Sequence, residues 1–250
     1  MTSQLPLALR WPRRQRFEHF HAGSNAAAVS AVRALALQTD APWVYLHGPS
    51  GSGRSHLLMA SCQACMAGNA DTELSEPARG AVGAARRAQY LPLAALDDPL
   101  AALLGAVGNG LLALDDLDAV AGNDPAERAL FDLYNRARAD GCALLFAAST
   151  APAQLGITLP DLRSRLGACA RFALKPLDVA ARRSVLHDYA AERGMHLDKP
   201  VLDWLFARYP RDLGALLDLL DQLDRASLAA QRSLTVPFVR EFLRSTAHSG

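Results

Sequence analysis

The segment HGPSGSGRSHLL, residues 47–58, limits the possible folds of this chain more than any other stretch. It follows a short apolar run, Trp43 to Leu46, and it leads into a helical pattern. A glycine-rich turn between a strand and a helix is the setting in which the pattern G-x-x-x-x-G-K-[ST] binds phosphate. Backbone N–H groups of the turn and the positive end of the helix attract an anion before any side chain contributes. The sequence therefore predicts a nucleotide-binding loop.

One residue departs from this pattern, because Arg54 stands between Gly53 and Ser55 where lysine is expected. Lysine is a compact charge that reaches the β- and γ-phosphates, whereas arginine is bulkier, planar and permanently charged. We expect the attraction for phosphate to survive and the geometry around the γ-phosphate to differ.

A second motif is LLALDD, in which the apolar residues 111–114 end in Asp115 and Asp116. This pattern predicts a buried strand with carboxylates at its C-terminal end, where open parallel sheets place their ligands. Such a pair can hold Mg²⁺ through water and orient a nucleophile. The alternative is that the two aspartates only cap the helix that follows them.

Strand and helix patterns alternate around these motifs. They follow each other at 88–96 (strand), 99–107 (helix), 125–141 (helix) and 142–150 (strand). The helix at 125–141 has one apolar stripe, made of Leu130, Leu133, Tyr134 and Ala137. This alternation predicts an α/β fold, a parallel sheet with helices on both faces. From about Lys175 onward only amphipathic helices are indicated, so a small all-helical domain should follow.

Charge, apolar runs and cysteine spacing make several classes of function less favoured. Lys plus Arg number 26 against 25 Asp plus Glu, and a net charge of +1 gives no general electrostatic footprint for nucleic acid. No apolar run approaches the roughly 18 residues of a membrane-spanning helix, and no secretory pattern opens the chain, so we expect a cytoplasmic protein. Cys62 and Cys65 form a C-x-x-C without a second Cys/His pair, which favours a buried helix face over a metal or redox site.

The order of these parts, with the segment LPDLRSRL at 159–166, resembles the AAA+ P-loop ATPases. The segment RFEHFHAGSNAAAVSAV, with Phe17, Phe20, Gly23 and Asn25, resembles a segment of the bacterial replication initiator DnaA. YPRDLGALLDLLDQLDRAS followed by LTVPFVREFL is more similar to the Hda family of DnaA-homologous regulators. The resemblance runs from about residue 4 to 245, without the insertion at 69–83, for which no role is assigned.

The resemblance implies three parts: an N-terminal clamp-binding segment at 1–15, an AAA+ nucleotide-binding domain at 16–174 and a helical lid at 175–250. In the first part, QLPLALR is similar to a peptide that binds the β sliding clamp. Gln4 would enter a polar pocket, and the apolar anchors would be Leu5, Leu7 and Leu9. The alternative is a flexible tail. The chain stops at Gly250 after the lid, so we expect no helix-turn-helix domain.

Site roles follow by matching positions to the family. The nucleotide, ADP or ATP with Mg²⁺, would contact Gly48, Pro49, Ser50, Gly51, Ser52, Gly53, Arg54, Ser55, His56, Asp115 and Arg211. Ser55 and Asp115 would hold the metal, the latter through water, and Asp116 occupies the place of a catalytic glutamate. Arg165 matches an arginine finger that acts on a neighbouring subunit, although a solvated basic loop is the alternative for Arg163 and Arg165. Phe17 and Phe20 either line the adenine pocket or pack under the first helix.

The family implies an adaptor that binds the DNA-loaded clamp and stimulates hydrolysis of DnaA-bound ATP, which prevents re-initiation of replication. Its own ATPase activity would be weak at most, in keeping with an arginine in the loop. DnaA and the clamp would be its partners, with DNA reached only through the clamp, no membrane contact and a homo-oligomer expected. Thr150 stands where initiators commonly have an acidic residue that senses the γ-phosphate, and Gly214 stands where some Hda proteins carry an additional arginine. The alternatives are a self-sufficient AAA+ ATPase such as a helicase loader, or a DnaA-like DNA-binding recruiter.

Overall fold

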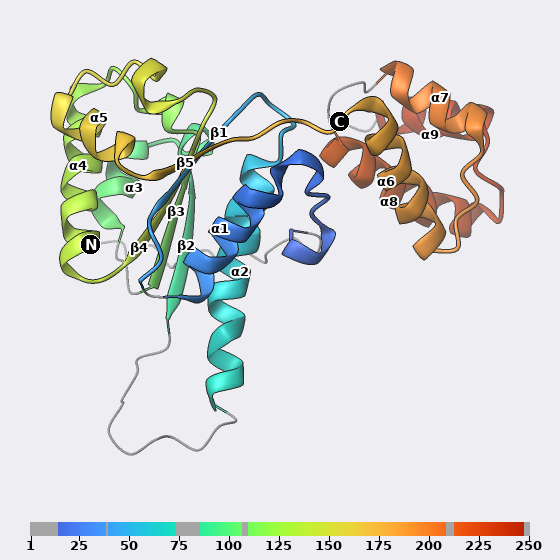
Figure 1. The fold of residues 1–250 in the computed structure, drawn as a ribbon. Coiled ribbons are helices and arrows are strands. Elements are labelled where there is room, and N and C mark those ends of the chain that lie inside the picture. The colour runs from blue at the N-terminus through green and yellow to red at the C-terminus, as the bar shows by residue number, and fades with distance from the viewer. Residues whose placement is uncertain (1–14, 39, 74–85, 107–109, 209–212, 248–250) are drawn as a thin grey trace, which may run out of the picture. The chain divides into compact units, whose positions relative to one another are not determined.

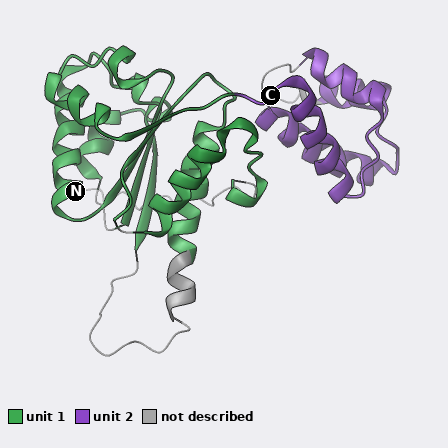
Figure 2. Cartoon of the chain, in the orientation of Figure 1, with its two compact units in different colours: residues 1–175 green, residues 176–250 purple. Residues whose placement is uncertain are grey.

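The computed structural model describes residues 15–38, 40–73, 86–106, 110–208 and 213–247, with the side chains of 68–73, 246 and 247 left out. The chain divides into two compact units, Met1–Lys175 and Pro176–Gly250 (Figure 2). The first unit is an α/β structure and the second is all helical (Figure 1). The predicted fold class is therefore confirmed.

The first unit is built on a five-stranded sheet in the order β2-β3-β4-β1-β5, and every pair of neighbours is parallel. The strands are β1 (Val44–His47), β2 (Arg87–Pro92), β3 (Gly110–Asp115), β4 (Ala143–Ala148) and β5 (Ala170–Ala173). All residues of β3 and β4 are buried. Continuous apolar runs of this kind form strands that helices cover on both sides.

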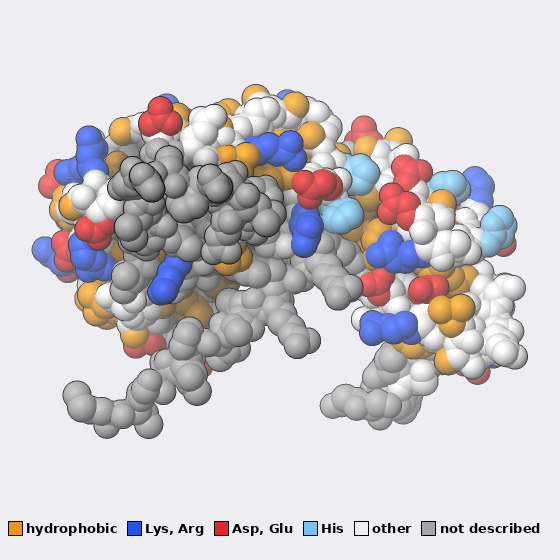
Figure 3. Space-filling view, turned by 90° about the horizontal axis from the view of Figure 1, so that it is seen from below, with side chains coloured by type: hydrophobic (Ala, Val, Ile, Leu, Met, Phe, Trp, Pro, Cys, Tyr) orange, Lys and Arg blue, Asp and Glu red, His pale blue; other side chains and the backbone are white. Residues whose placement is uncertain are grey.

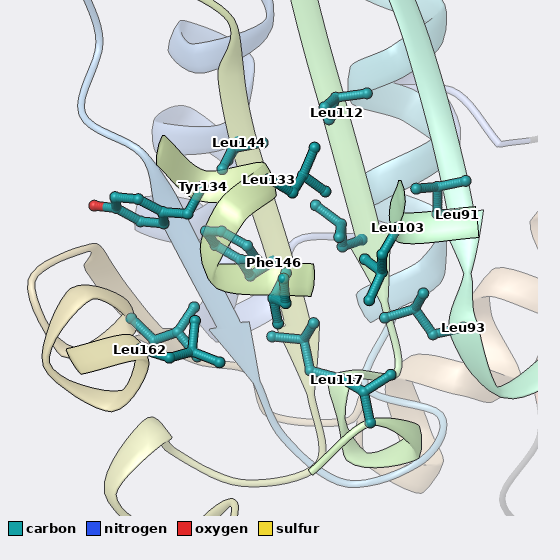
Figure 4. Packing of buried hydrophobic residues seen from close by; sticks show 14 of the residues in the cluster. Leu91, Leu93, Leu103, Leu112, Leu117, Leu133, Tyr134, Leu144, Phe146 and Leu162 are labelled. Atoms are coloured by element: carbon teal, nitrogen blue, oxygen red, sulfur yellow. The ribbon is translucent and has the colours of Figure 1, made fainter. Parts of the chain in front are cut away.

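Helices cover both faces of the sheet, and alternate residues of β3 show how the faces divide. Leu111 and Ala113 belong to the core under α1 (Ala26–Leu37) and α2 (Arg54–Glu73). Leu112 and Leu114 belong to the opposite core, which α3 (Pro99–Gly105), α4 (Asp124–Ala139) and α5 (Pro160–Gly167) complete. Figure 4 shows this second core. The predicted stripe of α4 is buried in it: Leu130, Leu133, Tyr134 and Ala137.

Two details of the sheet differ from the sequence analysis. The strand predicted at 88–96 ends at Pro92, and the chain continues as a 3₁₀ turn at Leu93–Ala95. Proline has no N–H for a further ladder bond, which accounts for the early end. The edge strand β5 was not predicted, because four residues of alternating exposure lack the apolar run that marks β3 and β4.

The junction between the two units begins with a pair of hydrogen bonds made by Asn25, which precedes α1. Its Nδ2 donates to the Lys175 carbonyl oxygen at 2.8 Å, and the Lys175 N–H donates to Asn25 Oδ1 at 2.9 Å. One residue earlier, the Leu174 N–H donates to the His47 carbonyl oxygen at 2.6 Å. The last residues of the first unit are thus fixed to the end of β1 and to the start of α1.

The second unit contains α6 (Val179–Glu192), α7 (Lys199–Arg208), α8 (Leu213–Ala230) and α9 (Val236–Ala247). Asp178 caps α6 by accepting the N–H of Ala181 at 2.7 Å. Apolar side chains from all four helices meet in one core that includes Leu186, Leu205, Leu220 and Val239. No helix in the described ranges has the length and apolar character needed to cross a membrane.

Candidate functional site

The predicted site residues meet at one edge of the sheet because β1 and β3 flank β4 on either side. His47 pairs with Ala148 and Leu114 with Phe146, so the three strands end at nearly the same level. The loop 48–53, the two aspartates after Leu114 and the segment after Ala148 therefore lie at the same carboxyl edge. This is where doubly wound α/β proteins bind ligands.

The loop between β1 and α2 depends on its glycines. Gly51 and Gly53 have φ angles of 77° and 92°, a region in which a side chain is strained. A Cβ atom at Gly53 would lie 2.5 Å from Cε2 of Phe20, and one at Gly48 would lie 2.5 Å from the Leu174 carbonyl oxygen. The loop is thus a tight turn enclosed by its neighbours.

Two polar atoms of this loop fit an anionic ligand. Ser52 Oγ and Arg54 Nη1 are buried and have no hydrogen-bond partner among the described residues. Buried polar atoms without a partner are costly, and phosphate oxygens can accept from both groups. Arg54 is the first residue of α2, so the positive end of that helix adds to the attraction. The residues present therefore fit the phosphates of a nucleotide.

Arg54 faces two carboxylates that follow β3. Its Nη2 lies 3.6 Å from Asp116 Oδ1 and its Nη1 lies 4.0 Å from Asp118 Oδ2, while only 14% of its side chain is exposed. Burial and then the charge of Asp115 raise the pKa of Asp116, and Arg54 opposes that shift. Arg54 and Asp116 were predicted to lie in one site, and the structure brings them together.

Asp115 and Ser55 are connected through a residue that the sequence analysis missed, Tyr90 on β2. The Tyr90 hydroxyl donates to Asp115 Oδ2 at 2.8 Å and also shares a hydrogen bond with the Ser55 side chain. Burial and the Asp115 carboxylate raise the pKa of Tyr90, so it remains a neutral donor. No cluster of three or more His, Cys, Asp or Glu in the described part of the chain could hold a metal. Ser55 and Asp115 suit Mg²⁺ that is also bound to phosphate, since Mg²⁺ commonly takes few protein ligands.

A second missed residue, Asp118, joins the end of β3 to the end of β4. It accepts the Ser149 N–H at 2.8 Å and also the Ser149 hydroxyl. The neighbouring carbonyl oxygen of Thr150 accepts the Tyr45 hydroxyl at 2.9 Å. The third acidic residue of DDLD was the available signal for Asp118, whereas Tyr90 has none beyond its place in a predicted strand.

Phe17 packs under the first helix, which is one of the two predicted alternatives, whereas Phe20 lies beside the phosphate-binding loop. Phe17 is buried in the core beneath α1, with the guanidinium of Arg33 over its ring. Phe20 is only partly buried and lies beside Gly53 and 5.3 Å from the His56 ring. His56 Nε2 lies 2.9 Å from the Arg16 carbonyl oxygen, so His56 contacts the segment that leads into the unit.

Cys62 and Cys65 lie on the buried face of α2, as the sequence analysis favoured. Both are free thiols, and burial raises the pKa of each. A buried thiol with a raised pKa is a poor nucleophile and a poor metal ligand.

The two candidate arginines of α5 differ in their surroundings. Arg165 lies over the rings of Phe131 and Tyr134, with centroid distances of 5.4 and 5.3 Å from its guanidinium carbon. Arg163 is exposed and donates to the Ile157 carbonyl oxygen at 3.5 Å. Arg165 is thus held against α4 rather than fully solvated.

Several predicted residues lie outside the described ranges. They are the clamp peptide residues Gln4, Leu5, Leu7 and Leu9, the lid residue Arg211 and the insertion from residue 74 onward. Gly214 is described and lies in the first turn of α8. On the face shown in Figure 3, acidic and basic side chains are interspersed where described residues are exposed.

Comparison with known proteins finds a family model that matches the helical unit and solved structures that share the fold of the chain. A family model described as Hda, lid domain, matches residues 180–243. Domain III of the replication initiation protein DnaA from Thermotoga maritima is similar at a TM-score of 0.69 and 17% identity, covering 94% of this chain and 98% of that chain. AMPPCP-bound DnaA from Aquifex aeolicus is similar at 0.59 and 18% identity, covering 85% of this chain and 66% of that one.

The fold is also shared with a motor protein. The RuvB Holliday junction branch migration motor of Thermotoga maritima is similar at a TM-score of 0.61 and 15% identity, covering 93% of this chain and 72% of that chain. At such identities the similarity to solved structures establishes the fold alone. The family model shows in addition that the helical unit is similar to the lid domain of the Hda family. The resemblance to the Hda family is thereby confirmed at the level these comparisons reach: the chain has the fold of DnaA domain III, and its residues 180–243 match the Hda lid domain model.

Proposed function

We propose that this chain is an adaptor that binds the DNA-loaded β sliding clamp and stimulates the hydrolysis of ATP bound to DnaA. The observation that carries this proposal is the Hda lid domain at 180–243 behind an AAA+ unit of the DnaA type. The clamp would be bound through Gln4, Leu5, Leu7 and Leu9, and the initiator would be contacted through α5. Hydrolysis would inactivate the initiator, so clamp loading would be linked to a block on re-initiation.

The place of Arg165 supports a role on a partner's nucleotide. The Arg165 guanidinium contacts the rings of Phe131 and Tyr134 on α4. The cation in the chain's own phosphate-binding site is a different residue, Arg54. In the proposal, the Arg165 guanidinium stabilises the charge on the phosphoryl group that leaves DnaA-bound ATP. An arginine supplied in this way raises the rate of phosphoryl transfer by about 10³- to 10⁵-fold in proteins that use one.

The chain's own site supports holding a nucleotide more than turning it over. We infer that the amides of 48–53 and Arg54 bind the phosphates of ADP or ATP, and that Ser55 and Asp115 hold Mg²⁺. Such a metal would neutralise part of the negative charge of the phosphates. Asp116, at the position of a catalytic base, faces Arg54 at 3.6 Å and has a raised pKa. A raised pKa by itself strengthens a base, but the charge of Arg54 opposes that shift, and the side chain is one methylene shorter than glutamate. We therefore expect Asp116 to orient a water molecule poorly and hydrolysis to be slow.

The test is hydrolysis of ATP prebound to DnaA in the presence of DNA-loaded clamp. The intact chain should stimulate the reaction, and both Arg165→Ala and Gln4→Ala should remove the stimulation while ADP still binds. An absence of stimulation by the intact chain, with ADP or with ATP supplied, would overturn the proposal. Fast turnover by the isolated chain, lost in Asp116→Asn, would instead support an independent ATPase; asparagine is chosen because residue 116 has a φ of 53° that alanine tolerates poorly.

A further inference from the structure

The carboxylate of Glu127 on α4 is buried completely and belongs to none of the site residues described above. Its Oε1 accepts the Gly122 N–H at 2.7 Å and the Thr158 N–H at 3.0 Å. Its Oε2 accepts the Thr158 N–H at 3.0 Å, the Thr158 hydroxyl at 2.8 Å and the Leu159 N–H at 2.7 Å. One side chain therefore holds two separate loops, the one that precedes α4 and the one that precedes α5.

Glu127 is ionised in this environment. Burial pushes its pKa upward, but the hydrogen bonds from Thr158, Leu159 and Gly122 outweigh burial and lower the pKa. A buried carboxylate is tolerated only when its lone pairs are satisfied, and here backbone and hydroxyl donors satisfy them. The arrangement depends on the charge as well as on the shape of the side chain.

The loop that Glu127 holds leads directly into α5. Leu159 is the residue before Pro160, where α5 begins, and Arg165 lies in the last turn of that short helix. The same helix that carries Glu127 also carries Phe131 and Tyr134, whose rings lie under the Arg165 guanidinium. In Figure 4, Tyr134 of α4 lies on the same side of the core as Leu162 of α5. Helix α4 thus contacts both the beginning of α5 and the arginine near its end.

We propose that Glu127 is a positioning residue for Arg165. By fixing residues 158 and 159, it sets where α5 starts and hence where the guanidinium lies on the rings of Phe131 and Tyr134. The proposal rests on the proposed function for the purpose of Arg165, but the positioning itself is a property of this chain alone.

Positioning is tested first without any partner, by the NMR signal of the Arg165 Nε–H group. A group over two aromatic rings has a ring-current shift, and the Arg165→Lys variant assigns the signal. In Glu127→Gln, one oxygen becomes an NH₂ group that faces donors, so we expect the ring-current shift of Arg165 to be reduced. The matched control is Asp124→Asn, the same change at an exposed acid of α4 that pairs with Arg128. It should leave the signal in place.

A milder variant keeps the proposal testable if Glu127→Gln does not fold. Thr158→Val removes a single donor to Glu127 and keeps a branched side chain of similar size. It should move the Arg165 signal in the same direction by a smaller amount. An unchanged Arg165 signal in folded Glu127→Gln, or in Thr158→Val when the first variant is unfolded, would overturn the proposal.

The second test is the stimulated hydrolysis of DnaA-bound ATP. In Glu127→Gln we expect the maximal rate to fall by about 10- to 100-fold, as for other small displacements of catalytic groups. The chain concentration for half-maximal stimulation and the affinity for ADP should stay unchanged. If Glu127→Gln keeps the full rate while Arg165→Ala is inactive, the positioning role of Glu127 is contradicted and the proposed function is not. If the intact chain gives no stimulation, the proposed function fails, and the Arg165 signal still decides whether Glu127 positions it.

Discussion

At the residue scale, the guanidinium of Arg54 lies near two carboxylates, and its buried Nη1 has no hydrogen-bond partner among the described residues. We expect Arg54→Ala to weaken ADP binding by about 10- to 100-fold, since a hydrogen bond to a charged group contributes about 1.5–3 kcal/mol. Arg54→Lys should keep most of the affinity because the charge remains. Calorimetric titration with ADP measures both variants, and equal affinity of the alanine variant and the intact chain would contradict the assignment of Arg54.

His56 gives a pH dependence at the same scale. Burial lowers its pKa below 6.5, although the hydrogen bond with the Arg16 carbonyl oxygen opposes the shift. Below pH 6.5 the unfolded chain binds a proton that the folded chain does not, so stability falls as the pH falls towards the folded pKa. Between pH 7.5 and 5.5, about one unit on either side of the usual histidine pKa, the intact chain should lose more stability than His56→Gln. Urea unfolding at both pH values measures this difference, and parallel losses would show that His56 is not responsible.

At the scale of elements, helix α8 offers a buried and an exposed leucine for comparison. Leu220 is fully buried in the lid core, whereas Leu228 is 71% exposed. Leu220→Ala should destabilise the second unit by about 2–5 kcal/mol, as deletions in packed cores do. Leu228→Ala should change stability by no more than about 0.5 kcal/mol. Thermal unfolding of the two variants makes the comparison, and similar effects would be inconsistent with the packing of α8.

Much of the arrangement of elements could be predicted from the sequence, because apolar periodicity is a local signal. The buried strands β3 and β4 and the stripe of α4 were found in this way. The residues that were missed act through distant partners. Glu127 contacts Thr158 and Leu159, and Asp118 contacts Ser149, each 31 or 32 positions along the chain.

One available signal was not used. Glu127 lies on the same helical face as Leu130 and Tyr134, and an acid on an apolar stripe is a buried charge that needs partners. The sequence could have indicated that partners exist, but only the folded sheet brings residues 158 and 159 to it. By contrast, the residues of the P-loop are contiguous in the sequence, so their grouping in one site could be predicted without knowledge of the fold.

At the scale of the whole molecule, the two units have separate cores. Among the described residues, the buried side chains of the lid core lie between 186 and 239, with Phe242 and Leu243 packed against them, and the two sheet cores contain none of these residues. We therefore expect a fragment of residues 176–250 to fold by itself, with the modest stability of a small domain. Circular dichroism should show helix content and a cooperative thermal transition. A fragment without a cooperative transition would show that the lid needs the first unit to fold.

Asn25 presents one donor and one acceptor to the backbone of Lys175, as a neighbouring strand would. Few side chains can replace it: aspartate lacks the donor, serine is too short to reach both groups, and glutamine adds a methylene to a fixed distance. Asn25 is also one of the residues on which the resemblance to the initiator was based. Over evolutionary time we expect substitution at this position to be rare, because a change there would release the chain at the point where the second unit begins.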